Sequence, residues 1–153
     1  MDVQIKALQT LAELETCCDI WLEASEKAHD FVDAGFWREK CGDMLEMYLP
    51  SSAVHLAYVG DTLAGFSATS ENSLEALFVR PGMWGHGIGK ALLLFLSSRH
   101  DVLHLAVYAK NKRAVTFYDR FGFIVTGTGT CSNTGENELY MEWKNPEQGE
   151  EHK

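Results

Sequence analysis

The chain has 153 residues, of which 46% are hydrophobic and 11% are aromatic, so it can bury the core of one folded domain. Its net charge of −9 disfavours nucleic acid and anionic membranes as partners. It has neither the roughly 18 uninterrupted apolar residues of a membrane span nor a signal peptide at its start. Its four cysteines lack the spacing of a metal site. We therefore expect a metal-free, cytoplasmic protein. The sequence leaves open whether it is a monomer or a homodimer.

The pattern of apolar residues predicts strands and helices in alternation, without internal repeats. Thr10 and Glu13 form a capping box at the start of the first helix, and Pro50 ends the second. Gly60 and Asp61 supply the turn of a hairpin. In chain order we expect strands at 3–7, 53–59, 62–70, 74–79, 103–108, 123–131 and 138–143, and helices at 10–25, 36–47, 88–99 and 112–121.

Two further features concern organisation and redox state. The strand–helix–strand unit over 74–108 is a crossover, so its two strands should run parallel. Residues 145–153 are polar and are expected to form a tail outside a single domain at 1–144. Cys17 and Cys18 are adjacent in the first helix, and we expect both to be buried, reduced thiols.

A glycine-dense loop lies between the strand at 74–79 and the helix at 88–99. Gly85, Gly87 and Gly89 alternate there, which lets backbone N–H groups crowd around an anion at the positive end of a helix dipole. A flexible connector is the alternative interpretation, but the apolar elements on both sides favour a binding loop. The loop therefore predicts a site for a phosphate-bearing cofactor.

The spacing of this loop excludes two common phosphate-binding motifs. A P-loop would need glycine at Trp84 and Ser or Thr at Ala91. The dinucleotide fingerprint would need glycine at Lys90. A nucleoside triphosphatase and a dinucleotide-binding domain are therefore both disfavoured.

Two sequence blocks carry the most specific signal. The first reads Val-Arg-Pro-Gly-Met-Trp-Gly-His-Gly-Ile-Gly-Lys over 79–90, and the second reads Asn-Lys-Arg-Ala-Val-Thr-Phe-Tyr-Asp-Arg-Phe-Gly-Phe over 111–123. In this order and spacing they resemble the GNAT superfamily of acetyl-CoA-dependent N-acetyltransferases. The stretch at 28–37 and the Tyr-Leu-Pro at 48–50 resemble a small bacterial subgroup of it. Trp84 departs from the family pattern, which usually has Arg or Gln at that position.

The resemblance implies an α+β fold and a reaction. The fold would be one domain with a mixed, mostly antiparallel sheet, flanked by about four helices, in which the parallel strands of the crossover splay apart. Acetyl-CoA would lie in that gap as cosubstrate, and its acetyl group would pass directly, in a ternary complex, to a primary amine of a small molecule, amino acid or peptide. The implied cofactor-binding residues are Leu77, Phe78, Val79, Gly85, His86, Gly87, Ile88, Gly89, Lys90, Asn111, Ala114 and Tyr118.

The resemblance also implies a catalytic role for Tyr118, as the proton donor to the departing thiolate. A packing aromatic on an amphipathic helix is the alternative for this residue. Asn111 also suits the N-cap of the helix at 112–121, whatever its role toward a cofactor. A non-catalytic acyl-CoA-binding sensor or interaction module remains the alternative function, because of Trp84 and the absence of a carboxylate at Ser73.

Glu75 is the candidate general base, because it is a lone carboxylate in an apolar strand where burial would strengthen it as a proton acceptor. A carboxylate at a strand edge is the alternative, and Glu71, His104 or ordered water are weaker candidates. The family carboxylate most often aligns with Ser73. Strict alternation would place 73, 75, 77 and 79 on one face of the strand, and 74, 76 and 78 on the other.

The acceptor amine is expected between the segment of the first two helices and the region of the last two strands. Aromatic side chains there, with one histidine and one carboxylate, suit an amine that carries an apolar part. Core packing of the aromatic residues and a helix cap at the polar pair are the alternatives. The candidate wall residues are His29, Asp30, Phe31, Phe36 and Trp37.

Overall fold

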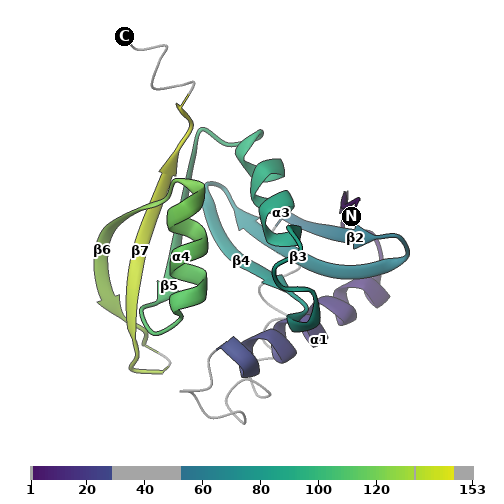
Figure 1. Cartoon of the computed structure of the whole chain (residues 1–153), viewed down its shortest axis with the longest axis horizontal. Helices are drawn as coiled ribbons and strands as arrows, with labels where there is room; N and C mark the ends of the chain where they lie inside the picture. The colour runs from purple at the N-terminus through teal and green to yellow at the C-terminus, as the bar shows by residue number, and fades with distance from the viewer. Residues whose placement is uncertain (1, 29–52, 133, 147–153) are drawn as a thin grey trace.

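The computed structural model describes residues 2–28, 53–132 and 134–146 (Figure 1). The described chain forms one seven-stranded sheet with helices packed on it, which confirms the α+β prediction. The expected helix at 36–47 lies outside the described residues. The elements are β1 (Gln4–Ala7), α1 (Leu11–Ala28), β2 (Ala53–Val59), β3 (Thr62–Ser70), β4 (Ser73–Val79), the 3₁₀ turn η2 (Pro81–Met83), α3 (Ile88–Ser97), β5 (Val102–Tyr108), α4 (Lys112–Phe121), β6 (Ile124–Thr130) and β7 (Asn137–Lys144).

The sheet has the order β1-β2-β3-β4-β5-β7-β6, and every neighbouring pair is antiparallel except β4 and β5. β4 and β5 run parallel, as the crossover predicts, and pair only where Ser73 lies opposite His104. Beyond this point the two strands separate, as Figure 1 shows between β4 and β5. The splayed parallel pair is therefore confirmed.

Helices cover both faces of the sheet. Leu56 of β2 belongs to a buried cluster with Ile20 of α1, whereas the next residue, Ala57, belongs to a cluster with Leu92 of α3. Successive strand residues point to opposite faces, so α1 and α3 lie on opposite sides. Tyr118 of α4 packs in a third cluster, which also contains residues of α3, β5 and β7.

A β-bulge interrupts β4. Thr69 and Ala68, which are consecutive in β3, pair with Leu74 and Ala76 of β4, so Glu75 is the extra residue without an opposite partner. Such an insertion shifts the direction of the side chains by one position. The alternation therefore changes at Glu75.

The bulge corrects the predicted faces of this strand. Leu74 packs in the cluster of α3, α4, β5 and β7, whereas Ala76 and Phe78 pack on the α1 side. The prediction that these three residues share a face was therefore wrong for Leu74. Strict alternation assumes a regular strand, and the extra residue breaks that assumption.

The predicted capping box starts α1. Thr10 Oγ1 accepts a hydrogen bond from Glu13 N at 3.1 Å, and Glu13 Oε1 accepts from Thr10 N at 3.1 Å. Glu13 Oε2 also accepts from the Tyr58 hydroxyl at 2.7 Å. One carboxylate therefore caps α1 and joins it to β2. The Tyr58 hydrogen bond is the main reason why the pKa of Glu13 is lowered.

The two adjacent cysteines of α1 differ in state. Cys17 is a buried free thiol, as expected, and burial raises its pKa to about 12. Cys18 is disulfide-bonded, so the expectation of a reduced thiol was wrong there. Consecutive helix residues point about 100° apart, and the two side chains therefore have different neighbours.

Candidate active site

A cavity of about 210 Å³ opens where β4 and β5 separate. Side chains from both sides of the sheet line it, since α1 and α4 both contribute. The cavity therefore passes between the two halves of the sheet. Its lining residues are Trp21, Ser25, Leu74, Glu75, Ala76, Leu77, Phe78, Leu105, Ala106, Val107, Tyr108, Asn111, Ala114, Tyr118 and Glu138.

Along this cavity, β4 has an edge whose backbone N–H and C=O groups are not paired with β5. β3 pairs with one edge of β4 as far as Val79, but β5 pairs with the other edge only at Ser73. Backbone groups without a partner in the sheet favour a ligand that can hydrogen-bond like an added strand. Leu77 and Phe78 lie in this separated part and line the cavity. This edge fits the amide-rich arm of coenzyme A.

The glycine loop beside the cavity has the geometry of an anion site. Gly85 and Gly87 are exposed and both have φ of 82°, a conformation that glycine adopts without strain. Gly87 is the N-cap of α3, and no described side chain caps the helix there. The first N–H groups of α3 are thus available to a phosphate. This part of the chain fits the predicted pyrophosphate site.

Other residues of the loop are occupied by contacts within the protein. A Cβ atom on Gly89 would lie 3.1 Å from Phe117 Cζ, so this glycine lets α3 pack closely on α4. His86 Nδ1 lies 3.1 Å from the carbonyl oxygens of Met83 and Trp84. The imidazole is therefore turned toward its own loop. Ile88 is buried in the core, and Lys90 is exposed.

α4 brings Asn111 and Tyr118 to the same cavity. Asn111 Oδ1 accepts a hydrogen bond from Ala114 N at 3.2 Å, which confirms the predicted N-cap. Tyr118 follows two helical turns later, is 8% exposed, and packs between the rings of Phe117 and Phe123. Burial raises the pKa of the Tyr118 phenol well above its usual range. The phenol therefore keeps its proton at neutral pH.

Two carboxylates line the cavity, and only one was predicted. Glu75 lines it from the bulge but is exposed, so the expectation of a buried carboxylate was wrong. The reason is the bulge, which turns this residue out of the regular packing of the strand. Glu138 of β7 is partly buried and lines the cavity as well. Its local sequence carries no signal, because only the position of β7 beside β5 brings it there.

The α1 side adds residues that sequence reasoning missed. Trp21 and Ser25 are one helical turn apart and line the cavity. Ser25 is fully buried, and its hydroxyl has no hydrogen-bond partner among the described residues. The Tyr108 hydroxyl lies 3.5 Å from Cys131 Sγ, and burial raises the pKa of this phenol. The helical spacing of Trp21 and Ser25 was the available signal, although it indicates only a buried face.

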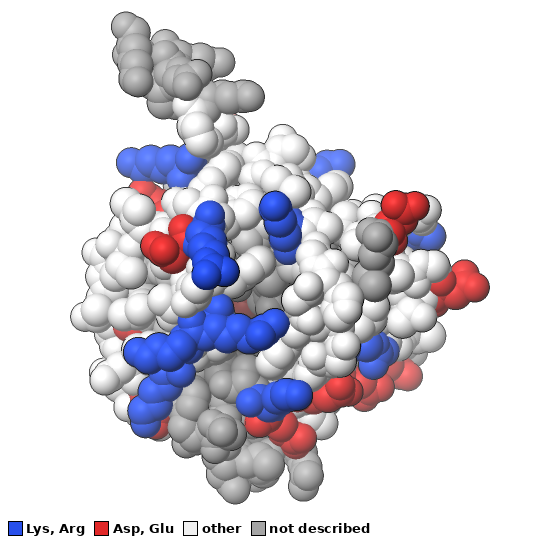
Figure 2. Space-filling model, in the orientation of Figure 1, with Lys and Arg blue, Asp and Glu red and all other residues white. Residues whose placement is uncertain are grey.

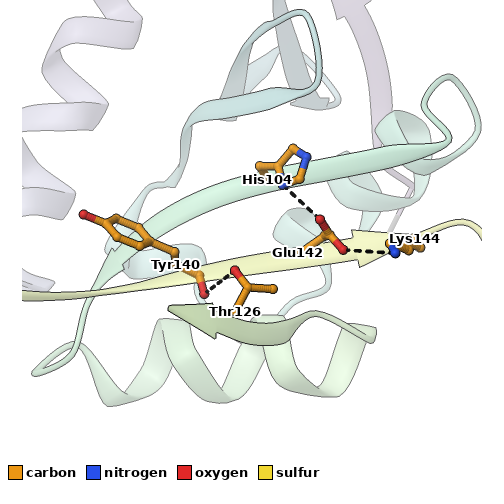
Figure 3. A network of polar contacts seen from close by, with 5 residues as sticks. All are labelled: His104, Thr126, Tyr140, Glu142 and Lys144. Carbon is orange, nitrogen blue, oxygen red and sulfur yellow. Dashed lines mark hydrogen bonds and ion pairs between the residues drawn. The ribbon is translucent and has the colours of Figure 1, made fainter. Parts of the chain in front are cut away.

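The weaker candidates for a base lie elsewhere. His104 Nδ1 lies 3.4 Å from Glu142 Oε2, and Lys144 Nζ lies 3.6 Å from the other oxygen of the same carboxylate (Figure 3). Glu71 is exposed in the turn between β3 and β4, with φ of 55°. His104 and Glu71 do not line the cavity in the described part of the chain.

The predicted acceptor wall of His29, Asp30, Phe31, Phe36 and Trp37 lies outside the described residues, and it stays a prediction. Within residues 2–28, 53–132 and 134–146, no three His, Cys, Asp or Glu side chains are grouped so that they could hold a metal ion. No helix of the described chain is both long and apolar enough to span a membrane.

The comparisons with known proteins agree with this geometry. The family described as Acetyltransferase (GNAT) domain matches residues 19–144. The peptidyl-lysine N-acetyltransferase YiaC of Escherichia coli is 32% identical over 133 residues, which cover 86% of this chain and 91% of YiaC. The peptidyl-lysine N-acetyltransferase YjaB of the same organism is 31% identical over 125 residues, which cover 81% and 84%.

Solved structures show the same fold. The solution structure of apo-form YjaB from Escherichia coli has a TM-score of 0.82 at 28% identity, and covers 94% of this chain and 98% of that one. The PaiA N-acetyltransferase of Thermoplasma acidophilum, in complex with coenzyme A, has a TM-score of 0.73 at 22% identity and covers 94% and 99%. By its domain match and its two relatives, this chain is an acyltransferase enzyme that belongs to the GNAT acetyltransferase family.

Proposed function

We propose that this enzyme transfers the acetyl group of acetyl-CoA to the side-chain amine of a lysine in a peptide or protein. The observation that carries the proposal is the cavity between the separated strands β4 and β5, which Tyr118 lines beside an uncapped, glycine-rich helix start. We further propose that the enzyme works as a monomer or homodimer in the bacterial cytoplasm.

The residues present fit acetyl-CoA, which supplies the acetyl group as an activated thioester. The free edge of β4 at Leu77–Val79 would hold the pantetheine arm through backbone hydrogen bonds. The loop at 85–90 would hold the pyrophosphate through N–H groups and the dipole of α3. Asn111 and Ala114 line the cavity next to this edge and complete the proposed cofactor site.

The chain's own residues divide the proton chemistry between them. Tyr118 is protonated and buried at the cavity, so it can donate a proton to the thiolate that leaves. Glu75 is the proposed acceptor of the proton from the incoming ammonium group, directly or through water. Its exposure suits an acceptor that must exchange protons with solvent.

The charge of the lining supports a cationic acceptor. Glu75 and Glu138 line the cavity, whereas no Lys or Arg does so among the described residues. Two carboxylates attract an ammonium group, and the rings of Trp21 and Tyr108 suit the apolar stem of a lysine. The relatives YiaC and YjaB are both named peptidyl-lysine N-acetyltransferases, which supports the same acceptor class. The segment 29–37 is the proposed remainder of this wall.

The test is thiol release from acetyl-CoA in the presence of lysine peptides, with mass spectrometry of the peptide. We expect release to depend on the peptide and its lysine to gain one acetyl group. Tyr118→Phe should lower kcat by about 100-fold because the proton donor is lost. The free energy of unfolding should change little, because the ring keeps its packing against Phe117 and Phe123.

Tyr140→Phe is the matched control, since Tyr140 is an exposed tyrosine of β7 that does not line the cavity. Its kcat should equal that of the wild type. A panel of small amines and free amino acids tests the acceptor class. Turnover of these alone would contradict the peptide acceptor. Tight coenzyme A binding without turnover of any amine would contradict the enzyme proposal and favour an acyl-CoA sensor.

A further inference from the structure

Trp84 holds a fixed position at the entrance of the glycine loop. Its indole Nε1 donates a hydrogen bond to the carbonyl oxygen of Val79 at 2.8 Å, so its one polar atom is bound to the end of β4. The ring also packs on the buried cluster under α3. The indole is therefore anchored at one end and held along its side.

Two positively charged side chains from distant parts of the chain lie against this ring. Lys27 lies in the last turn of α1, and its Nζ is 5.7 Å from the ring centroid. Arg113 lies in the first turn of α4, and its Cζ is 4.7 Å from the same centroid. Both distances are in the range of cation–π attraction. Trp84 thus gathers two positive charges directly before Gly85.

The local charge contrasts with that of the whole protein. The chain has a net charge of −9, yet Lys and Arg side chains gather across the centre of the face in Figure 2. Lys27 and Arg113 are exposed, and neither forms an ion pair among the described residues. Two like charges repel each other beside one ring. An anion bound near both cations would offset this repulsion.

We propose that Trp84, Lys27 and Arg113, named here the cation cradle, bind the phosphate groups of the cofactor. This inference rests on the proposed use of acetyl-CoA. The loop supplies N–H groups, and the cradle adds the positive side chains that Trp84 itself lacks. A guanidinium can donate two parallel hydrogen bonds to a phosphate. The indole face keeps Arg113 in place beforehand, which reduces the entropy lost on binding.

The test measures the affinity of three ligands by titration calorimetry: coenzyme A, dephospho-coenzyme A without the 3′-phosphate, and pantetheine without any phosphate. Trp84→Ala and Arg113→Gln should each weaken coenzyme A binding by about tenfold. Lys27→Gln should weaken it less, because its cation lies farther from the ring. The affinity for pantetheine should not change in any variant.

Two further variants sharpen the result. Trp84→Ala combined with Arg113→Gln should lose less affinity than the sum of the single losses, since both disturb one contact. Trp84→Arg should recover much of the affinity, because it places a cation on the loop itself. Dephospho-coenzyme A identifies which phosphate the cradle binds. If the variants lose as much affinity for this ligand as for coenzyme A, the cradle binds the pyrophosphate. If they bind it as well as the wild type does, the cradle binds the 3′-phosphate.

Arg99→Gln is the matched control. Arg99 also lies on an aromatic ring, with Cζ 4.4 Å from the centroid of Phe95, but it follows the opposite end of α3. Its coenzyme A affinity should equal that of the wild type. Wild-type affinity in the cradle variants, or an equal loss for pantetheine, would overturn the cradle while leaving the acetyltransferase proposal intact. A wild-type protein that binds no coenzyme A would overturn both.

Discussion

Tyr118 and Glu75 line the same cavity but differ in their access to water. The phenol is 8% exposed, and burial raises its pKa, so it holds a proton. The carboxylate stands on a bulge and is exposed. A buried acid and an exposed proton acceptor on either side of one cavity suit a reaction in which protons leave one reactant and enter another.

The role of Glu75 predicts a pH-dependent defect in Glu75→Gln. A lysine amine has a pKa of about 10.4 in solution, so at low pH it arrives protonated and needs an acceptor. We expect the variant to lose the most turnover near neutral pH and to approach the wild type as pH rises. The measurement is kcat/KM for a lysine peptide across this range.

Glu71→Gln is the control for that profile, because Glu71 is an exposed carboxylate in the preceding turn and does not line the cavity. It should follow the wild-type curve. A defect in Glu75→Gln that is equal at every pH would instead indicate a purely structural or electrostatic carboxylate.

At the scale of elements, two irregularities lie in neighbouring parts of β4: the bulge and the separation of this strand from β5. The bulge at Glu75 reverses the faces of the strand, and the loss of pairing with β5 after Ser73 frees its edge. A regular strand between β3 and β5 would have neither an exposed carboxylate nor unpaired backbone there. Both irregularities therefore create the cavity rather than disturb the sheet.

The start of α1 provides a stability prediction. Thr10→Ala removes the hydroxyl that accepts from Glu13 N, and we expect it to lower the free energy of unfolding by about 1 kcal/mol. Thr16→Ala on the same helix removes only a bond to the carbonyl of Ala12. It should leave stability unchanged or slightly higher, because Ala is the better helix former. Urea unfolding measures the free energy of unfolding of both variants. An equal decrease in the two would contradict a stabilising role of the Thr10 cap.

At the scale of the whole molecule, the α3 side of the sheet carries a buried polar group that the site does not use. The ring of His55 in β2 packs at a tilt against that of Phe95 in α3, with ring centroids 4.7 Å apart, and its buried Nδ1 has no hydrogen-bond partner in the part of the chain that the structure describes. Burial lowers the pKa of His55, and the nearby Arg99 and His100 add to this shift. The folded protein therefore favours the neutral imidazole.

This shift predicts how stability depends on pH. Because the pKa of His55 is lower in the folded state, the unfolded chain takes up the proton first as pH falls below the ordinary value of 6.5. The contribution of His55 is thus present above that pH and is lost below it. We expect the free energy of unfolding to fall between about pH 7 and pH 5, and to fall less in His55→Gln.

Urea unfolding at several pH values measures this difference. His86→Gln is the control, because His86 lies on the exposed glycine loop, and it should keep the wild-type slope. Parallel slopes for the wild type and His55→Gln would contradict a role of the buried imidazole in acid sensitivity.

Several parts of the fold and site followed from short stretches of sequence. The capping box of Thr10 and Glu13 and the N-cap at Asn111 both appear as expected. Each depends on residues within a few positions of one another, so local spacing contains the information. Within the described residues, the order of strands and helices followed for the same reason, from the period of apolar residues.

The sequence by itself determined the elements of the described residues and the glycine loop, because these are local properties of the chain, and its resemblance to the GNAT family indicated the residues of α4 that reach the cavity. Only the tertiary structure decided that Glu75 stands on a bulge, that Glu138 joins it across the gap, and that Trp84 receives Lys27 and Arg113. These features depend on strand register and on contacts between segments far apart in sequence. Register follows from the packing of the whole sheet, and no single segment specifies it.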